Sequence, residues 1–381
     1  MAYFPGNAIG LSRRTTKSAN AHERGLRQGP SPCDAGALNA MSTPDLVSTH
    51  RNYPLVTITI PTFNRAPLLR DCVASALSQT YRNFEVLVSD NASTDETRET
   101  LSEFTDPRLR VIRQERNIGL LPNWNSCLAC AKGDYIVFLS DDDRIAPWLL
   151  ERCIGVIGQQ PQVPIVVTLT NRHSPSIGKT FPARFSRSLE TGIWDGTEIL
   201  AQFLKDQITV TICGVMMRTA LVRARGGFSL NFPHTADVAA WAPLLFLGNA
   251  GFVNEACATH SCHNKSESAR MSVEELLRDG WQMANLISDQ AKEHIGDAPR
   301  RRMLQVQSRR CFARRGLVLL SDYRKNGGDI QTLLNFIWRF RRYLSDVNVA
   351  AVLRFMAIVL CPRWLADRIR ELRPTVPERL A

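Results

Sequence analysis

Three consecutive aspartates, Asp141, Asp142 and Asp143, closely follow a short apolar run at residues 135–139. A run this short and apolar is typical of a strand buried on both faces. The three carboxylates cannot be core residues, because desolvation and mutual repulsion would be severe. At the carboxyl end of a strand, aspartates can hold a hard divalent cation, which in turn can hold a phosphate. The pattern therefore indicates either such a site or a solvated acidic turn.

The segment before the aspartates alternates regularly between strand and helix patterns. Strands are predicted at residues 55–60, 84–88, 109–112 and 134–139, with helices at 64–78, after residue 96, and at 123–132. Alternation of this kind predicts a parallel sheet with right-handed crossovers. Asp90, which follows the second strand, should then lie at the same sheet edge as the aspartates. This expected convergence favours a binding site over an isolated acidic turn.

Two local signals suggest where the helices begin. Asn64 is a favourable N-cap, and Pro67 fits the first turn of the helix that follows. Ser93 and Glu96 have the spacing of a capping box, which would open the next helix.

Several motifs occur along this alternation in a fixed order. They are Pro61-x-Phe63-Asn64-Arg65, Ser75…Gln79-Thr80-Tyr81, Glu85-Val86-Leu87-Val88-Ser89-Asp90-Asn91-x-Ser93-x-Asp95, Asn117-x-Gly119, Gly133-Asp134-Tyr135-Ile136 and Leu139-Ser140-Asp141-Asp142-Asp143…Pro147. Together they resemble the family 2 glycosyltransferases, which have an A-type nucleotide-sugar-binding fold. The resemblance covers residues 55–150 and continues more weakly to about residue 268. It implies an α/β, Rossmann-like domain with a mixed, mainly parallel sheet.

The resemblance also implies a binding site for the nucleotide of a nucleoside-diphosphate sugar, with a UDP-sugar favoured. The implied nucleotide-binding residues are Pro61, Thr62, Asn64, Arg65, Asp90, Asn117 and Asp141. Asp90 would hydrogen-bond the base, and Asp141 would face the ribose and diphosphate. The other interpretation of Asp90 is a turn-capping residue. Arg113 or Arg116 would lie near the base or phosphates, or either could be a surface charge.

A divalent cation, Mg²⁺ or Mn²⁺, is the cofactor that the resemblance implies. Many members of the family have Asp-x-Asp where this chain has Ser140-Asp141-Asp142. Pro147 sets the register and makes Asp142 the expected metal ligand, assisted by Asp143. His263 is in register for a family histidine that reaches back to the metal or diphosphate. Its other interpretation is a solvated loop histidine.

The second half of the chain carries the residue expected to act as general base. Gly226-Gly227-Phe228 matches the glycine pair that precedes the catalytic acid of the family, and Asp237 stands at the position of that acid. The family base usually follows another acid, but here Ala236 takes that place, so a single carboxylate is available. The alternative is that Asp237 only caps an apolar helix at 238–247.

Length and cysteine usage limit the class of protein. A chain of 381 residues can form one large or two modest domains. Its ten cysteines are irregularly spaced, and the first 40 residues contain no apolar signal-peptide core. These features predict a reducing, cytoplasmic setting. A zinc site that includes Cys127 and Cys130 is conceivable, but the spacing suits no known ligand framework well.

The domain boundaries are expected near residues 50 and 268. Residues 1–50 lack periodicity and are predicted to be disordered, and Met41 is a hypothetical alternative start. Residues 51–268 would form the catalytic domain, and residues 269–381 a basic helical region. Helices are predicted there at 272–293, opened by a Ser272 to Glu275 capping box, at about 299–321 and at 329–345; the apolar stretch 347–360 follows.

The positive charge is concentrated in this helical region. The net charge of the chain is +11, and residues 300–381 carry +12. Such a tail could lie on the anionic inner face of a membrane, or its helices could pack on the catalytic domain with arginines outward. Nucleic acid is not expected as a partner, because no recognition module is present. No segment of about 18 uncharged apolar residues exists, so a spanning helix is not expected.

The activity that the resemblance implies is an inverting transfer of a sugar to an acceptor hydroxyl, on a glycan or a lipid-linked acceptor, in cell-surface polysaccharide or glycan synthesis. Two alternatives remain. A nucleotidyltransferase of related fold would need a loop rich in glycine and basic residues directly after the first strand. The segment that follows the first strand here is Pro61-Thr62-Phe63-Asn64-Arg65, which is not such a loop. A non-catalytic scaffold of polysaccharide assembly would have kept the fold and lost turnover, although Asp90, Asp142 and Asp237 are all present.

Overall fold

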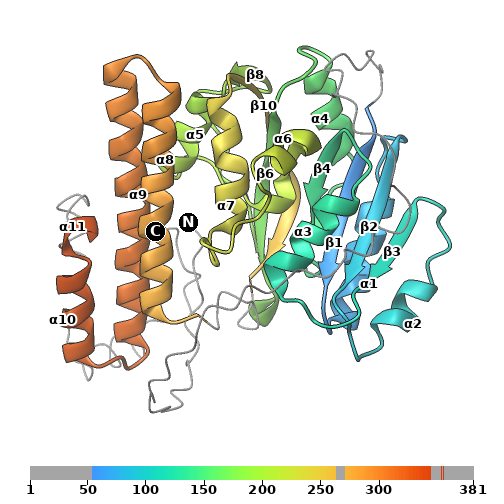
Figure 1. Ribbon diagram of the computed structural model, residues 1–381, viewed down its shortest axis with the longest axis horizontal. Coiled ribbons are helices and arrows are strands. Elements are labelled where there is room, and N and C mark those ends of the chain that lie inside the picture. The colour runs from blue at the N-terminus through green and yellow to red at the C-terminus, as the bar shows by residue number, and fades with distance from the viewer. Residues whose placement is uncertain (1–53, 263–270, 345–352, 354, 356–381) are drawn as a thin grey trace, which may run out of the picture.

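The computed structural model describes residues 54–262, 271–344, 353 and 355. In this part of the chain, a ten-stranded sheet runs across the molecule and a long helical hairpin stands beside it (Figure 1). The strands are β1 (Val56–Thr62), β2 (Phe84–Asp90), β3 (Leu109–Arg113), β4 (Tyr135–Phe138), β5 (Arg144–Ile145), β6 (Ile165–Ser174), β7 (Lys179–Phe181), β8 (Gly192–Asp195), β9 (Val215–Arg218) and β10 (Asn249–Ser261). The α-helices are α1 (Ala66–Leu77), α2 (Thr97–Ser102), α3 (Leu120–Cys130), α4 (Leu149–Ile157), α5 (Gly196–Leu204), α6 (Thr219–Ala224), α7 (Ala236–Trp241), α8 (Val273–His294), α9 (Ala298–Lys325), α10 (Ile330–Arg339) and α11 (Arg341–Leu344).

The sheet has a parallel N-terminal part and a mixed remainder. Its strand order is β3-β2-β1-β4-β9-β6-β10-β5, with β7 paired to β6 and β8 to β10. The first four strands pair in parallel, and antiparallel pairing begins where β9 joins β4. The predicted α/β class, a mixed sheet followed by helices, is therefore confirmed. The four strands predicted from the sequence correspond to β1, β2, β3 and β4, with ends shifted by a few residues.

Strand β4 shows why the sequence before the aspartates is continuously apolar. Tyr135 and Val137 face one apolar core, and Ile136 and Phe138 face the other; all four are at most 2% exposed. Alternate residues of a strand point to opposite faces, so a strand covered on both sides needs apolar residues throughout. Helices α1 and α4 contribute to the first core, and α3 contributes to the second.

The predicted cap of the first helix is wrong. Helix α1 has Arg65 as its N-cap, and Asn64 instead has a positive φ of 53°. The amide of Ala66, at the start of the helix, donates to Asp95 Oδ2 at 3.0 Å. A carboxylate from a distant loop thus takes the role that local sequence assigned to Asn64.

The predicted capping box of the second helix is also wrong. Helix α2 begins at Thr97, and its N-cap Glu96 makes no side-chain capping bond. Ser93 is buried, and its Oγ accepts from the amide of Asn64 at 2.9 Å. The serine therefore joins two loops and does not open a helix.

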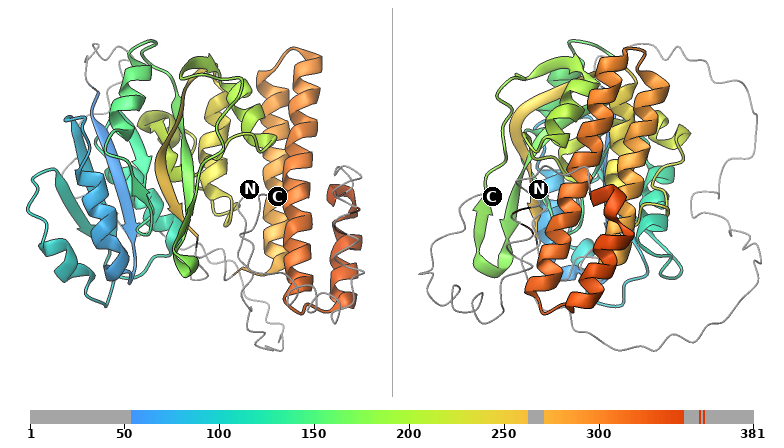
Figure 2. Two further views of the ribbon diagram at one scale, coloured as in Figure 1. Left: turned by 180° about the vertical axis from the view of Figure 1, so that it is seen from behind. Right: turned by 90° about the vertical axis from the view of Figure 1, so that its left-hand side faces the viewer.

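The helices after residue 271 follow the predicted pattern more closely. Ser272 and Glu275 form the expected capping box of α8, and Asp329 caps α10 through a bond from the Thr332 amide. Helices α8 and α9 form an antiparallel hairpin, and α7 lies between this hairpin and the sheet (Figures 1 and 2).

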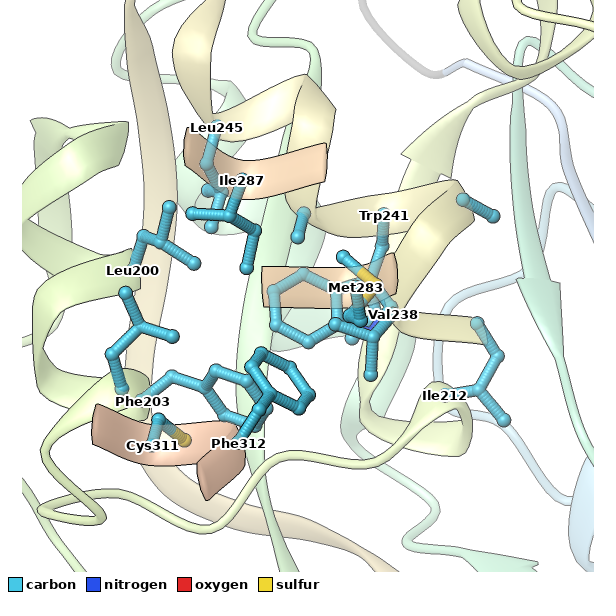
Figure 3. Close-up of a cluster of buried hydrophobic side chains, with 14 of the residues drawn as sticks. Leu200, Phe203, Ile212, Val238, Trp241, Leu245, Met283, Ile287, Cys311 and Phe312 are labelled. Carbon is cyan, nitrogen blue, oxygen red and sulfur yellow. The ribbon is translucent and has the colours of Figure 1, made fainter. Parts of the chain in front are cut away.

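The hairpin shares one apolar core with the sheet domain. Phe312 and Met283 from the hairpin pack among Phe203, Trp241 and Leu245 from the sheet side (Figure 3). The rings of Phe203 and Trp241 meet edge to face, with centroids 5.0 Å apart. The domain boundary at 268/269 remains a sequence prediction, and the apolar core continues across it.

Some sequence predictions fall outside the described residues. They are the disorder of residues 1–50, the alternative start at Met41, the position of His263 and almost all of the apolar stretch 347–360. Among the helices of residues 54–262 and 271–344, none combines the length and the apolar character needed to cross a membrane.

Truncation of Phe312 tests whether the hairpin and the sheet domain unfold together. Phe312 is 1% exposed, so Phe312→Ala should lower the free energy of unfolding by about 3–5 kcal/mol. Leu334→Ala, at a side chain that is 49% exposed, should change it by no more than about 0.5 kcal/mol. Denaturant titration followed by fluorescence and circular dichroism measures both. Two separate transitions, only one of them shifted by Phe312→Ala, would show that the hairpin is an independent unit.

Candidate active site

The ends of β1, β2 and β4 bring the predicted polar residues to one edge of the sheet. Thr62 and Asp90 are direct neighbours in the β1–β2 register. The amide of Leu139, just beyond β4, donates to the carbonyl of Thr59 at 2.9 Å, which continues that pairing. Two residues later, Asp141 Oδ2 accepts from Thr62 Oγ1 at 2.8 Å. The three strand ends therefore converge on one side of the sheet.

Arg65 forms ion pairs with two of the three aspartates. Its Nη1 donates to Asp141 Oδ1 at 3.0 Å and to Asp142 Oδ2 at 2.8 Å. Asp141 is only 5% exposed. Burial, together with the neighbouring charge of Asp142, raises the pKa of Asp141 to about 7 against the lowering effect of Arg65. The carboxyl cluster therefore carries more negative charge than the single guanidinium fully compensates.

The chemistry of this cluster suits a divalent cation. Carboxylate oxygens are the ligands that Mg²⁺ and Mn²⁺ prefer, and a cation beside Asp141 and Asp142 would favour the ionised form of both. Within the described residues, no group of three or more histidine, cysteine, aspartate or glutamate side chains is arranged to hold a metal. Any such site would therefore be completed by substrate oxygens, by water or by residues outside the described part, where His263 lies.

Asp143 has different partners from the other two aspartates. Its Oδ1 accepts from the amide of Ser261 at 2.8 Å and lies 3.1 Å from Nδ1 of His260. Burial alone would lower the pKa of His260, but the Asp143 carboxylate raises it well above its ordinary value. Asp143 therefore ties the acidic turn to the end of β10, whereas Asp141 and Asp142 face Arg65. Its expected role as a metal ligand is untested.

On the β2 side, Asp90 is held by a turn and by an arginine. Its Oδ1 accepts from the amide of Ser93 at 2.8 Å, and its Oδ2 forms an ion pair with Arg113. Arg113 also donates through Nη2 to the carbonyl of Ser93 at 2.7 Å. The carboxylate thus makes the turn-capping contact that was one of its two interpretations. Of the two arginines considered, Arg113 is the one that contacts Asp90.

Asparagines join the loops around this edge. Asn64 Oδ1 accepts from the amide of Thr94 at 2.7 Å. Asn117 Oδ1 accepts from Asn91 Nδ2 at 3.0 Å and from the amide of Gly119 at 2.9 Å. These bonds fix the loops that follow β1, β2 and β3 relative to one another. Pro61, also predicted here, lies within β1 opposite Ser89.

Asp237 lies in the first turn of α7. The N-cap of α7 is Thr235, so the alternative that Asp237 is that cap is wrong. Burial raises the pKa of Asp237, whereas the amide of Val238 and the charge of His260 lower it. His260 therefore pairs with Asp143 of the acidic turn and also interacts electrostatically with the expected base.

The segment before Asp237 is anchored to α3. Gly226 and Gly227 both have positive φ, 83° and 69°. The backbone of Phe228 exchanges two hydrogen bonds with the side chain of Asn125, at 2.8 and 2.9 Å. The Phe228 ring packs edge to face against Phe138 of β4, with centroids 4.6 Å apart. The glycine pair thus makes the turn that docks this segment onto the sheet domain.

Three groups at the site were not assigned a role from the sequence. Asn91 links two loops, His260 pairs with Asp143, and the buried carboxylate of Asp279 from α8 accepts from the amides of His234 and Thr235. The only sequence signal for Asp279 is an acid on the apolar side of an amphipathic helix, among Leu276, Gly280 and Met283.

The fold matches that of a solved protein whose structure holds a nucleotide. Residues 1–349 of S. aureus TarS, crystallised with UDP, superpose with a TM-score of 0.55 and 15% sequence identity. The superposition covers 84% of this chain and 93% of that chain. This likeness confirms the predicted A-type nucleotide-sugar-binding fold.

Sequence comparison then identifies the domain that the chain resembles. Residues 57–223 match the profile described as glycosyl transferase family 2. Chondroitin synthase of Pasteurella multocida is 27% identical over 226 residues, which are 58% of this chain and 22% of that protein. An Escherichia coli protein described as UDP-Glc:alpha-D-GlcNAc-diphosphoundecaprenol beta-1,3-glucosyltransferase WfaP is 28% identical over 229 residues, which are 59% of this chain and 83% of that protein. Residues 57–223 therefore carry a domain that matches glycosyl transferase family 2, and the chain matches only about a fifth of the length of the chondroitin synthase.

Mn²⁺ should stabilise the protein by binding beside Asp142. At saturating Mn²⁺ the unfolding temperature should rise by roughly 2–5 °C at pH 8. The rise should be smaller at pH 6, because the proton that Asp141 binds below about pH 7 competes with the cation. Differential scanning fluorimetry measures the shift. Asp142→Asn should abolish it, and Asp289→Asn, at an exposed aspartate of α8, should leave it unchanged. An equal shift in all three proteins would mean that Mn²⁺ binds elsewhere.

Proposed function

We propose that the protein is an inverting glycosyltransferase that moves a sugar from a nucleoside-diphosphate sugar, with a UDP-sugar favoured, to an acceptor hydroxyl. The observation that carries this proposal is the convergence of Thr62, Asp90 and the Arg65–Asp141–Asp142 cluster at the strand ends. Asp143 pairs with His260, and the charge of His260 also acts on Asp237. A donor diphosphate needs the groups at the strand ends, and an acceptor hydroxyl needs a base. The match to the family profile supports the same activity.

The donor side is the edge formed by the ends of β1, β2 and β4. Asp90 and Asn117 delimit the end of the proposed site that would hold the base. Thr62, Asn64 and Asp141 delimit the end that would hold the ribose and diphosphate. Pro61 and Arg65 complete this side, and the guanidinium offers positive charge to the diphosphate. A Mg²⁺ or Mn²⁺ ion held by Asp142, with Asp143 and His263 as the other expected ligands, would supply Lewis-acid stabilisation of the leaving diphosphate.

On the acceptor side, Asp237 would take the proton of the attacking hydroxyl. The hydroxyl oxygen bonds to the anomeric carbon as the bond from that carbon to the diphosphate breaks, and the proton passes to an Oδ atom of Asp237. A single displacement of this kind inverts the anomeric configuration. Burial raises the pKa of Asp237, which makes its carboxylate a stronger base than an exposed aspartate.

The proposed acceptor is a glycan or a lipid-linked glycan in cell-surface polysaccharide synthesis. The printed names of two relatives support this class: a chondroitin synthase and a glucosyltransferase for a diphosphoundecaprenol-linked acceptor. The residues of this chain that bind the sugar acceptor would lie near α7.

Release of nucleoside diphosphate tests the function directly. The full chain is incubated with Mn²⁺, with UDP-, GDP- or dTDP-sugars, and with p-nitrophenyl glycosides as model acceptors. Formation of the diphosphate together with a glycosylated acceptor supports the proposal. Release of pyrophosphate from a nucleoside triphosphate with a sugar phosphate would instead identify a nucleotidyltransferase. Binding of a nucleotide sugar without turnover under all conditions would favour a non-catalytic scaffold.

Replacement of Asp237 should separate catalysis from donor binding. Asp237→Asn should lower kcat by roughly 10²- to 10⁴-fold, because no base remains for the acceptor proton. The dissociation constant for UDP should stay within about twofold, since the hydrogen bonds among Thr62, Arg65 and Asp141 do not involve Asp237. In the wild type, kcat/KM should fall as the pH drops through the raised pKa of Asp237, because only the ionised form accepts a proton. Near-normal turnover by Asp237→Asn would exclude it as the base, and Asp289→Asn is the matched control.

We also propose that α10 touches the anionic inner face of a membrane, consistent with the predicted cytoplasmic, peripheral location. Ile330, Leu334 and Trp338 form one exposed stripe along α10, with exposures of 42%, 49% and 67%. Arg341 lies over the Trp338 ring at 4.6 Å from its centroid. An exposed apolar stripe beside arginines matches the headgroup and acyl boundary of an anionic bilayer.

Vesicle binding tests this contact. The full chain should bind phosphatidylcholine vesicles that contain phosphatidylglycerol, and bind phosphatidylcholine alone more weakly. Trp338→Ser should weaken the binding by roughly tenfold, because one large apolar side chain no longer enters the interface. Ile177→Ser, at a side chain that is 64% exposed on another element, is the control. Equal binding by wild type and Trp338→Ser would contradict the contact, and a concentration-dependent dimer would show that a second copy covers the stripe.

A further inference from the structure

A carboxylate from the helical hairpin is directed at the chain that leads into the expected base. Asp279 of α8 is 1% exposed. Its Oδ1 accepts from Thr235 Oγ1 at 2.6 Å, and its Oδ2 accepts from the amides of His234 at 2.9 Å and Thr235 at 3.4 Å. A buried carboxylate is costly unless it is well hydrogen-bonded, and these bonds are its compensation.

These bonds replace a local helix cap. Thr235 is the N-cap residue of α7, but its side chain makes no capping bond and donates to Asp279 instead. The residues just before Asp237 are therefore held by α8 and not by their own sequence. Removal of Asp279 would free the start of α7, which carries Asp237 in its first turn.

A positive charge is held on the second helix of the hairpin. The guanidinium carbon of Arg315, on α9, lies 5.0 Å from the Phe203 ring centroid and 5.2 Å from that of Phe312. Its Nη2 is 3.8 Å from Asp206 Oδ1. Its Nε is buried and has no hydrogen-bond partner in the described part of the chain. The two rings and Asp206 fix the position of the guanidinium, and its charge interacts with that of Asp237.

We propose that Asp279 is a positioning residue for Asp237, so that the α8–α9 hairpin is a functional part of the active site. The proposal rests on the function proposed above, because it assigns the hairpin to the base of that reaction. Asp279 need not touch the substrate, because it acts through the backbone that leads into the base.

The charged groups around Asp237 predict opposite effects for loss of Asp279 and loss of Arg315. His260 of β10 and Arg315 of α9 lower the pKa of Asp237, and Asp279 of α8 raises it; His234 interacts electrostatically with both Asp279 and Arg315. Loss of the negative charge at Asp279 should therefore move the acidic limb of the kcat/KM profile to lower pH. Loss of the positive charge at Arg315 should move it to higher pH. General damage to the fold cannot produce shifts of opposite sign.

The test compares Asp279→Asn, Arg315→Met and Arg315→Lys in the full chain, with the UDP-sugar that the donor screen identifies. Asp279→Asn should lower kcat by roughly 10- to 100-fold through misplacement of the base, with UDP affinity within about twofold. The acidic limb of the kcat/KM profile should move to lower pH in Asp279→Asn and to higher pH in Arg315→Met. In Arg315→Lys the limb should return to its wild-type position. Ser308→Ala removes another buried hydrogen bond of the hairpin, to the carbonyl of Ala284, and should leave both kcat and the limb unchanged.

The outcomes separate this inference from the proposed function. An active wild type with the same kcat and the same acidic limb as Asp279→Asn overturns the inference alone. A wild type that releases no nucleoside diphosphate from any donor overturns the proposed function and the inference with it. Should Asp279→Asn fail to fold, as a lost unfolding transition would show, Thr235→Val removes the hydroxyl that donates to Asp279 Oδ1, and a wild-type kcat in that variant overturns the inference.

Discussion

Two carboxylates share one nitrogen of Arg65, and the proposed donor edge is built around that shared ion pair. Buried charges need compensation, and Asp141 receives it from Arg65 and from the hydroxyl of Thr62. Arg65 is the N-cap residue of α1. The chain just before it turns at Asn64, which has a positive φ, and Asp95 accepts from the first helical amide. The ion pair and the tight loop therefore occur together at the start of the helix.

A second constraint connects this edge to the acceptor side. Asp143 cannot join its two neighbours on Arg65, because its carboxylate is bonded to His260 and Ser261 at the end of β10. Strand β10 is long, and irregularities in its pairing with β6 let it bend as it crosses the molecule. Its far end pairs with β8, which leads into α5, and α5 packs against α9. The same strand that anchors the acidic turn thus reaches the elements that support the hairpin.

The sequence predicted what depends on local periodicity and missed what depends on distant partners. The apolar run of β4 and the alternation before it were enough to place Asp90 and Asp141 at one edge. The caps at Asn64 and Ser93 were wrong because both side chains found loop partners that no local pattern reveals. His260 was not assigned a role, since no motif shows that it pairs with Asp143. Asp279 could have been noticed as an acid on an apolar helix face.

The residues that match the family contain only part of the proposed active site. The matching residues, 57–223, include Asp90 and the acidic turn but end before Asp237. The proposed donor-binding residues thus lie in the part of the chain that matches the family, and the proposed base and its supports lie beyond it. The elements beyond residue 223 share one apolar core with the sheet. With Asp237 as the proposed base, the groups that select the acceptor are to be sought on α7 and on the surfaces of α8 and α9 that face it.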